Sequence, residues 1–145
     1  MPSEAEYERA ARGPKGRLYP WGNLFNSRAA NHGRLGLDQT DASDGYAELA
    51  PVGAFPAGRT PEGFLDLSGN AAEWVEDPYT EDYGGAVPDP NQPALRTTRG
   101  GHYLSAGPLL RAAARQPQDP DARAPFIGFR CAKSVGTIGA GDDPR

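Results

Sequence analysis

The stretch GFLDLSGNAAEWVED, from Gly63 to Asp77, places spaced carboxylates around a turn of small residues. Asp66 and Glu73 flank the tripeptide Gly69-Asn70-Ala71, where an open turn can aim backbone carbonyls at the point that both carboxylates face. Such a set of oxygen donors suits calcium. The alternative is an Asx-type turn that leads into a helical turn over 70–76, with Glu73 on the surface. The residues by themselves favour this alternative.

An acidic loop upstream, LDQTDASDGY, is a second candidate for calcium. Asp38, Asp41 and Asp44 follow one another at intervals of three, and the turn residue Gly45 comes next. The loop is not an EF-hand, because the carboxylates of an EF-hand alternate every second residue and end in a bidentate glutamate. The alternative is a solvated acidic turn, which these residues alone favour.

Length, composition and charge restrict the fold classes and functions that are open to the chain. A chain of 145 residues is enough for one domain, and its 19 glycines and 15 prolines predict much ordered loop. The net charge of -4 provides no basic stripe, which argues against nucleic acid or an anionic membrane as partner. Cys131 is the single cysteine, so no internal disulfide can form. With no signal-peptide pattern and no apolar run of membrane-spanning length, we expect a cytoplasmic protein.

Local signals predict a few regular elements between loops. A capping box of Ser3 and Glu6 predicts a helix over 3–12, which Gly13-Pro14 ends. An extended segment is expected over 48–55 and a surface excursion over 77–93, while strands are expected over 96–104, 110–115 and 126–133. Residues 135–145 have the composition of a flexible tail.

Other catalytic chemistries find little support. Ser105 lies three residues from His102, but the chain contains no G-x-S-x-G elbow. His32, His102 and Cys131 lack the paired spacing of a transition-metal site. The glycines of GTIGAG follow no βαβ pattern, which excludes a dinucleotide-binding turn.

Seven motifs in order resemble the formylglycine-generating enzyme, or sulfatase-modifying factor, family. They span nearly the whole chain from Pro2 to Ala132 and read PSEAEYERAARG, YPWGN, APVGAFP, GFLDLSGNAAEWVED, RGGHY, LRAAAR and GFRCA. The resemblance implies an α+β, irregular and loop-rich fold that is related to the C-type lectin fold. It places the domain at residues 1–134, followed by the tail at 135–145.

The resemblance also implies two calcium ions. Family members hold the first through an Asn side chain, an Asp and two backbone carbonyls, which correspond to Asn31, Asp44, His32 and Tyr46. The second site corresponds to the opening stretch, with ligands at Asp66, Gly69, Ala71 and Glu73. With the resemblance added, both sites become the preferred interpretation, because ions that bind only the folded state stabilise a domain with little core.

The sequence departs from the active enzymes at the centre of their chemistry. Those enzymes oxidise a cysteine of a sulfatase peptide with two cysteines that hold copper. Here Ser105 stands at the first of these positions, and the second has no counterpart in a shorter loop. Because a hydroxyl cannot replace a soft thiolate as a ligand of copper(I), no copper is expected. His102 and Ala72 also replace family residues, whereas Arg115 and Arg130 are retained.

A further departure concerns the start of the chain. In the family roughly half of the domain precedes the segment PSEAEYE, whereas here only Met1 does. We therefore expect a fold that is truncated at its N-terminus, completed by a missing N-terminal half or by a partner chain. Without that half, the segment with Phe126, Ile127 and Phe129 is expected to present an unpaired strand edge.

These observations favour a non-catalytic module, stabilised by calcium, that binds a peptide, protein or small molecule. Its groove is expected to be lined by His102, Tyr103, Ser105, Arg111 and Arg115, although a plain strand end with a surface loop accounts equally well for these residues. Two enzymatic alternatives stay open. One is a sulfatase maturation factor that generates formylglycine, and the other is the substrate-pocket half of an ergothioneine-type sulfoxide synthase.

Overall fold

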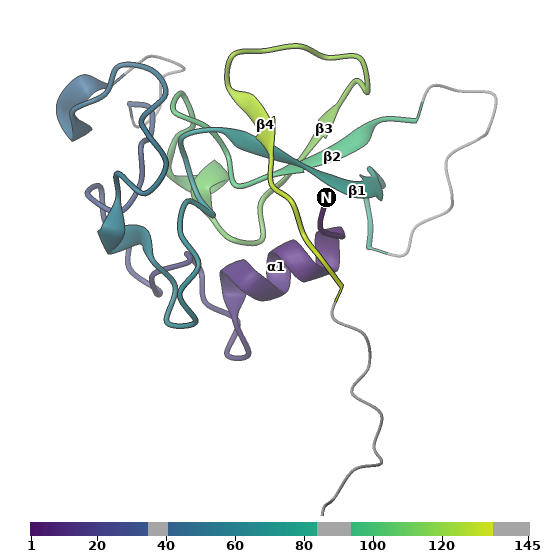
Figure 1. Cartoon of the computed structure of the whole chain (residues 1–145), viewed down its shortest axis with the longest axis horizontal. Coiled ribbons are helices and arrows are strands. Elements are labelled where there is room, and N and C mark those ends of the chain that lie inside the picture. Colours follow the sequence, from purple (N-terminus) through teal and green to yellow (C-terminus); the bar gives the residue numbers. More distant parts are fainter. Residues whose placement is uncertain (35–40, 84–93, 135–145) are drawn as a thin grey trace, which may run out of the picture.

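The computed structural model describes residues 1–34, 41–83 and 94–134. Its longer elements are one helix and a small four-stranded sheet, with three short 3-10 turns between them (Figure 1). The elements in chain order are α1 (Glu4–Arg12), the 3-10 turns Ala42–Asp44 and Pro56–Gly58, β1 (Ala72–Pro78), β2 (Arg96–Arg99), the 3-10 turn Gly107–Leu110, β3 (Arg115–Gln118) and β4 (Ile127–Phe129). The predictions for Asp38, for 84–93 and for the tail at 135–145 lie outside the described residues.

Helix α1 forms as the capping box predicts. The Ser3 amide donates to the Glu6 carboxylate at 2.8 Å, and the Glu6 amide donates to the Ser3 hydroxyl at 3.2 Å. At the other end, Gly13 has a φ of 60° and donates its amide to the Arg9 carbonyl. Both ends of the helix are thus satisfied by local bonds, as stable helices require.

The sheet has the strand order β3-β2-β1-β4, with β1 and β4 parallel and the other neighbours antiparallel. Figure 1 shows α1 lying below this sheet, and the long loops of the first half of the chain occupy the side next to it. Strand β4 lies at one edge, where Phe129 is 68% exposed. The expected edge is therefore present within the described sheet, although Phe126 just before β4 is half-buried.

Strand β1 corrects the prediction of a helical turn over 70–76. Ala72 and Glu73 pair with β4 on one side, and Glu73 and Trp74 pair with β2 on the other. Asn70 just before the strand has a φ of 63°, which no right-handed helical residue adopts. Pairing on both sides therefore outweighs the weak local preference for a helix.

Four other predicted segments differ from the structure. The strand expected over 96–104 ends at Arg99, because Gly100 and Gly101 adopt φ values of 87° and 68° that break an extended backbone. The segment 110–115 is not a strand, since the 3-10 turn Gly107–Leu110 precedes it and β3 begins only at Arg115. Residues 48–55 contain no strand, and β4 covers only three residues of 126–133.

The apolar core is small. Tyr7, Ala11, Leu67, Val75 and Ala112 form one buried cluster between α1 and the sheet. The Tyr7 hydroxyl donates to the Leu67 carbonyl at 3.1 Å, which satisfies the polar end of this buried ring. Because this apolar cluster is small, polar contacts have to stabilise much of the fold.

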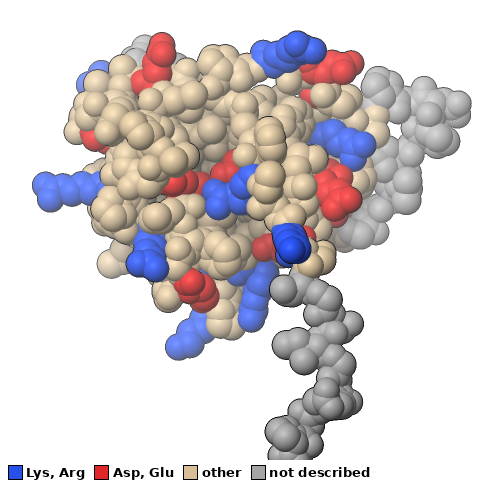
Figure 2. Space-filling view, viewed as in Figure 1, with Lys and Arg blue, Asp and Glu red and all other residues tan. Residues whose placement is uncertain are grey.

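Charged side chains are spread over the surface. On the face in Figure 2, acidic and basic side chains are interspersed, and the basic ones do not gather into a single stripe. Among the described residues, no helix is long and apolar enough to cross a membrane.

A buried ion-pair cluster joins α1 to the sheet. Arg99 is 1% exposed and donates to Glu4 at 3.1 Å and to Glu8 at 2.7 Å. It also donates to the carbonyls of Ala112 and Ala113. The partners compensate the desolvation of this guanidinium, which without them would destabilise the fold by several kcal/mol.

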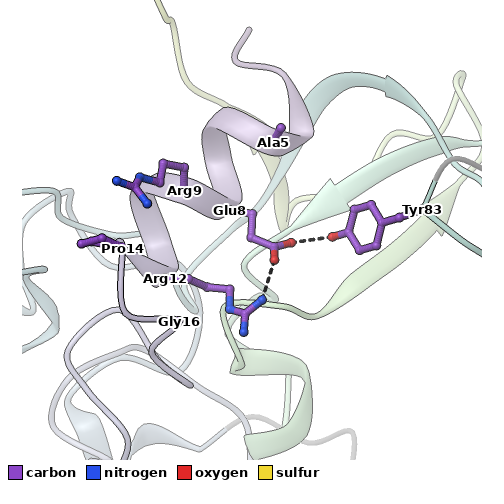
Figure 3. A pocket seen from close by; sticks show the side chains of 8 residues that line it. Ala5, Glu8, Arg9, Arg12, Pro14, Gly16 and Tyr83 are labelled. Atoms are coloured by element: carbon purple, nitrogen blue, oxygen red, sulfur yellow. Dashed lines mark hydrogen bonds and ion pairs between the residues drawn. The ribbon is translucent and has the colours of Figure 1, made fainter.

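Two further side chains extend the cluster toward the surface. Arg115 binds Glu4 through two bonds of 2.6 and 2.9 Å, and its guanidinium lies 4.3 Å from the centre of the Tyr83 ring. The Tyr83 hydroxyl donates to Glu8, which also accepts a bond from Arg12 (Figure 3). Burial raises the pKa of Glu8, but the bonds from Tyr83, Arg12 and Arg99 outweigh it, so that the pKa lies below the usual value.

Replacing Arg99 by Met should lower the free energy of unfolding by about 3 kcal/mol or more, because acidic groups of the cluster lose a buried partner. Urea denaturation of the full chain measures this change. Arg111→Met is the matched control, since Arg111 is exposed, and it should change the stability by no more than about 0.5 kcal/mol. Equal stability of the two variants would contradict a structural role for the cluster.

The lowered pKa of Glu8 predicts an acid-sensitive contribution to stability. The ionised form is favoured in the folded state, so the contribution is present above the usual carboxyl pKa of 4.5 and is lost as the pH falls through the lower folded value. Thermal unfolding at pH 7 and pH 3 should show a smaller acid-induced fall of the Tm for Glu8→Gln than for the unmodified chain. Identical falls would show that Glu8 does not contribute to the acid sensitivity.

Candidate functional site

The four residues of the first predicted calcium site come together in the structure. The 3-10 turn Ala42–Asp44 carries Asp44 at its end, and the left-handed Gly45 turns the chain toward Tyr46. The Asp44 carboxylate accepts the Tyr46 amide at 2.9 Å and the His32 amide at 3.2 Å. These bonds hold the segment that contains Asn31 and His32 against the acidic turn.

Asn31 provides the strongest indication of a ligand in this cluster. Its side chain is buried, and the amide nitrogen donates to the Glu48 carbonyl at 2.7 Å and to the Asn70 side-chain oxygen at 3.1 Å. Because two acceptors face the nitrogen, the orientation of the amide group is defined. The other atom, Oδ1, is buried and has no hydrogen-bond partner. Such an unsatisfied oxygen costs about 1–3 kcal/mol unless a cation or another donor occupies its lone pairs.

The second predicted site is a pocket of about 320 Å³ below the start of β1. Its lining includes all four predicted residues together with their neighbours Asn70 and Arg130, and comprises Val52, Leu65, Asp66, Gly69, Asn70, Ala71, Glu73, Gly128, Phe129 and Arg130. Left-handed residues shape the pocket, since Asp66 has a φ of 58° and Gly69 one of 76°. Gly69 also needs to be glycine because a Cβ there would overlap the Asn31 carbonyl oxygen.

Glu73 in this pocket is buried, so the alternative that placed it on the surface is wrong. Arg130 donates two bonds of 2.5 Å to its carboxylate and further bonds to the carbonyls of Leu65 and Asp66. Burial raises the pKa of Glu73, and the neighbouring Arg130 opposes this shift only in part. Each carboxylate oxygen has a second lone pair, so the ion pair leaves Glu73 with acceptor capacity toward the pocket.

The donor types in both clusters fit calcium better than other metals. In the part of the chain that the structure describes, no group of three or more His, Cys, Asp or Glu side chains could share a metal. A cation here would therefore be held by backbone carbonyls and amide oxygens with one or two carboxylates, as is common for calcium and unsuited to zinc or copper. Asn31, His32, Asp44 and Tyr46 would hold one ion, and Asp66, Gly69, Ala71 and Glu73 the other.

Part of the predicted ligand groove forms a compact turn. Ser105 is 1% exposed, and its hydroxyl accepts the His102 amide at 2.9 Å. The His102 ring stacks on Phe126 with 4.2 Å between ring centres, while Tyr103 is buried and meets the same Phe126 ring edge-on. Ser105 therefore stabilises the turn, and the partly exposed atoms of His102 and Phe126 form its outer surface.

The two arginines of the predicted groove lie elsewhere. Arg111 is exposed, and Arg115 belongs to the ion-pair cluster with Glu4. The structure thus brings His102, Tyr103 and Ser105 together and places Arg115 apart from them, against α1. The pocket that contains Asp66 and Glu73 has none of these five residues in its lining.

Surface hollows and one residue were not anticipated from the sequence. A surface pocket of about 470 Å³ lies beside α1, where Glu8, Arg9, Arg12 and Tyr83 surround it (Figure 3). A smaller one of about 310 Å³ lies between α1 and the chain after β4 and includes the exposed Cys131. Asn70 contacts both candidate metal clusters, which its position in a glycine-rich turn did not reveal.

Comparison with known proteins agrees with the loop-rich arrangement of one helix and a small mixed sheet. The sequence model of one protein family, the sulfatase-modifying factor enzyme 1-like domain, matches residues 1–135 of the chain. The chain therefore belongs to the family of formylglycine-generating enzymes and their relatives. This result confirms the resemblance that the seven motifs indicated.

Relatives in this family include both inactive and active proteins. The chain is 37% identical to the inactive C-alpha-formylglycine-generating enzyme 2 of Mus musculus, over 94% of this chain and 43% of that protein. It is 34% identical to the formylglycine-generating enzyme of Bos taurus, over 91% of this chain and 38% of that protein. It thus spans less than half the length of these two relatives.

A solved structure shows the same fold. PvdO from Pseudomonas aeruginosa superimposes with a TM-score of 0.70 at 32% sequence identity, covering 89% of this chain and 50% of that one. The described sheet, helix and loops thus correspond to part of a larger family domain.

Proposed function

We propose that this chain is a non-catalytic member of the family, stabilised by calcium, that acts as a ligand- or protein-binding module. The observation that carries the calcium part is the buried, unpartnered Oδ1 of Asn31, whose neighbour His32 donates its backbone amide to the Asp44 carboxylate. The common pocket of Asp66, Gly69, Ala71 and Glu73 supports a second ion. When bound, each ion would supply a fixed positive charge that crosslinks loop segments distant in the sequence.

The non-catalytic part rests on the absence of a thiol pair. Ser105 occupies the position that a copper-binding cysteine has in active relatives, and its hydroxyl is already engaged with the His102 amide. Cys131 is the single cysteine among the 145 residues, so these residues by themselves supply no pair of thiolates. Copper(I) requires soft sulfur ligands, which a lone thiol and a buried hydroxyl do not supply.

The family alone does not decide activity, because inactive and active relatives are about equally similar to the chain. Two enzymatic alternatives therefore remain open. One is a sulfatase maturation oxidase, and the other is the substrate-pocket half of a sulfoxide synthase. For the binding module, the surface of His102 and Phe126 is the proposed contact for a peptide, protein or small molecule. The net charge of -4 argues against nucleic acid.

Removal of calcium should lower the thermal stability of the full chain. An ion that binds only the folded state contributes about 2.7 kcal/mol at a hundredfold excess over its dissociation constant. Thermal unfolding in calcium and in the chelator EGTA measures the difference, and magnesium serves as the ion control. The Asp44→Asn variant, which keeps one acceptor oxygen but loses the charge, should show a smaller response to calcium. A Tm that is the same in calcium and EGTA would contradict the proposal.

The chain should fail to convert a sulfatase-type peptide to its aldehyde. Incubation with copper and a peptide of pattern C-x-P-x-R should leave the peptide cysteine unchanged, as measured by mass spectrometry, because no thiol pair holds the metal. An active formylglycine-generating enzyme provides the positive control, and the Cys131→Ser variant should behave like the unmodified chain. Appreciable aldehyde formation would favour the oxidase alternative.

A further inference from the structure

Asn70 bonds to Asn31 of the first candidate calcium site and lines the pocket of the second. Its side-chain oxygen accepts the Asn31 amide group at 3.1 Å and the Ala50 amide at 2.8 Å, and its own amide group donates to the Ala50 carbonyl at 3.1 Å. All polar atoms of this side chain are thus engaged. These hydrogen bonds fix the orientation of the side chain, and none of its polar atoms depends on water for a hydrogen-bond partner.

The backbone of Asn70 is equally constrained. Its amide donates to the Asn31 carbonyl at 2.9 Å, and its carbonyl accepts the Tyr103 amide at 3.0 Å. Its neighbours Gly69 and Ala71 are the residues whose carbonyls belong to the second candidate site. With a φ of 63°, Asn70 sets the direction of the chain at that turn.

The bond between Asn70 and Asn31 determines where the unpartnered oxygen points. Asn31 directs its nitrogen to the oxygens of Asn70 and Glu48, so Oδ1 has to face the opposite side. Without the Asn70 acceptor, the amide group of Asn31 could rotate more freely and bind a cation less well. The same turn therefore orients a side-chain oxygen for the first site and two backbone carbonyls for the second.

We propose that Asn70 is a positioning residue that couples the two calcium sites, so that binding at one site raises the affinity of the other. The proposal rests on the proposed calcium binding. An ion at the second site orders the turn 69–71, and the bonds of Asn70 then order Asn31 before the first ion arrives. Because coupling between two binding equilibria is reciprocal, an ion at the first site favours the second by the same factor.

The coupling is measured by calcium titration calorimetry of the full chain after chelation and dialysis. Asp66→Gly removes a side-chain ligand of the second site at a position where the φ of 58° suits glycine. Although Asp66 is not a ligand of the first site, this change should weaken the first site by about fivefold or more, the lower range of ordinary coupling. Asp44→Asn should weaken the second site by the same factor.

Replacing Asn70 by Gly should remove this coupling. Glycine accepts the φ of 63° and keeps the backbone bonds, so the turn can persist while Asn31 loses its acceptor. In this background Asp66→Gly should leave the affinity of the first site unchanged. Asn70→Asp keeps the acceptor oxygen and should retain the coupling, which a merely structural role of the side chain would not explain. Asn26→Gly, at an exposed turn, is the matched control.

The outcomes separate this inference from the proposed function. If the unmodified chain binds calcium at both sites but Asp66→Gly and Asp44→Asn act independently, the coupling is wrong and calcium binding stands. This comparison leaves Asn70 unchanged, so it decides the question even where Asn70→Gly does not fold. Coupling that persists in a folded Asn70→Gly variant would overturn the role of Asn70. If no calcium binds at all, the inference and the proposed function both fail.

Discussion

The left-handed turn in front of β1 is the constraint on which the rest of the structure depends. Three separate segments meet there through backbone bonds, as Gly69 donates to Gly100, Asn70 donates to Asn31 and Tyr103 donates to Asn70. The turn has to be narrow, because the Asn31 carbonyl lies where a side chain of Gly69 would be. It directs β1 into the centre of the sheet, with β2 and β4 on its two sides. Asn31 of the first candidate metal cluster bonds to this turn, and the pocket of the second includes it.

Polar contacts provide much of the stability that an apolar core provides in other domains of this length. The buried cluster of α1 and the sheet contains Arg99 and Glu4, and Arg130 binds Glu73 together with two loop carbonyls. Such pairs depend on geometry, because removal of one partner leaves a desolvated charge. A fold held in this way tolerates long loops but depends on a few charged residues, which agrees with the large share of glycine and proline in the sequence.

The elements that could be predicted from the sequence are those with local signals. The helix over 4–12 follows from Ser3, Glu6 and Gly13, which lie within or beside it. Strand β1 was missed because its partners in β2 and β4 are far along the chain, and Ala-Ala-Glu by itself favours a helix. The burial of Arg99 could not be foreseen either, since it depends on carboxylates of a helix at the other end of the chain.

The candidate metal residues likewise divide into those that local spacing indicated and those that only the family resemblance indicated. Spacing suggested oxygen donors near Asp44 and Asp66, but by itself it favoured a solvated turn around Asp44 and an Asx-type turn that leads into a helical turn after Asp66. The family resemblance supplied the juxtaposition of Asn31 with Asp44, which a single sequence cannot reveal. The predicted ligand groove combined neighbours in the sequence with Arg115, a basic position that the family resemblance marks as retained. In space its guanidinium turns to Glu4 and to the rings of Tyr79 and Tyr83.

The ion pairs of α1 have a consequence for biosynthesis. Glu4 and Glu8 leave the ribosome early, whereas their partners Arg99 and Arg115 are translated much later. Until then the helix can use only its capping bonds and its contacts with earlier segments, such as the bond from Tyr7 to Leu67 and the bond from Glu4 to Asp77. Contacts of such high sequence separation form slowly. The ion pairs of α1 with the sheet can therefore form only after β2 and β3 have been synthesised.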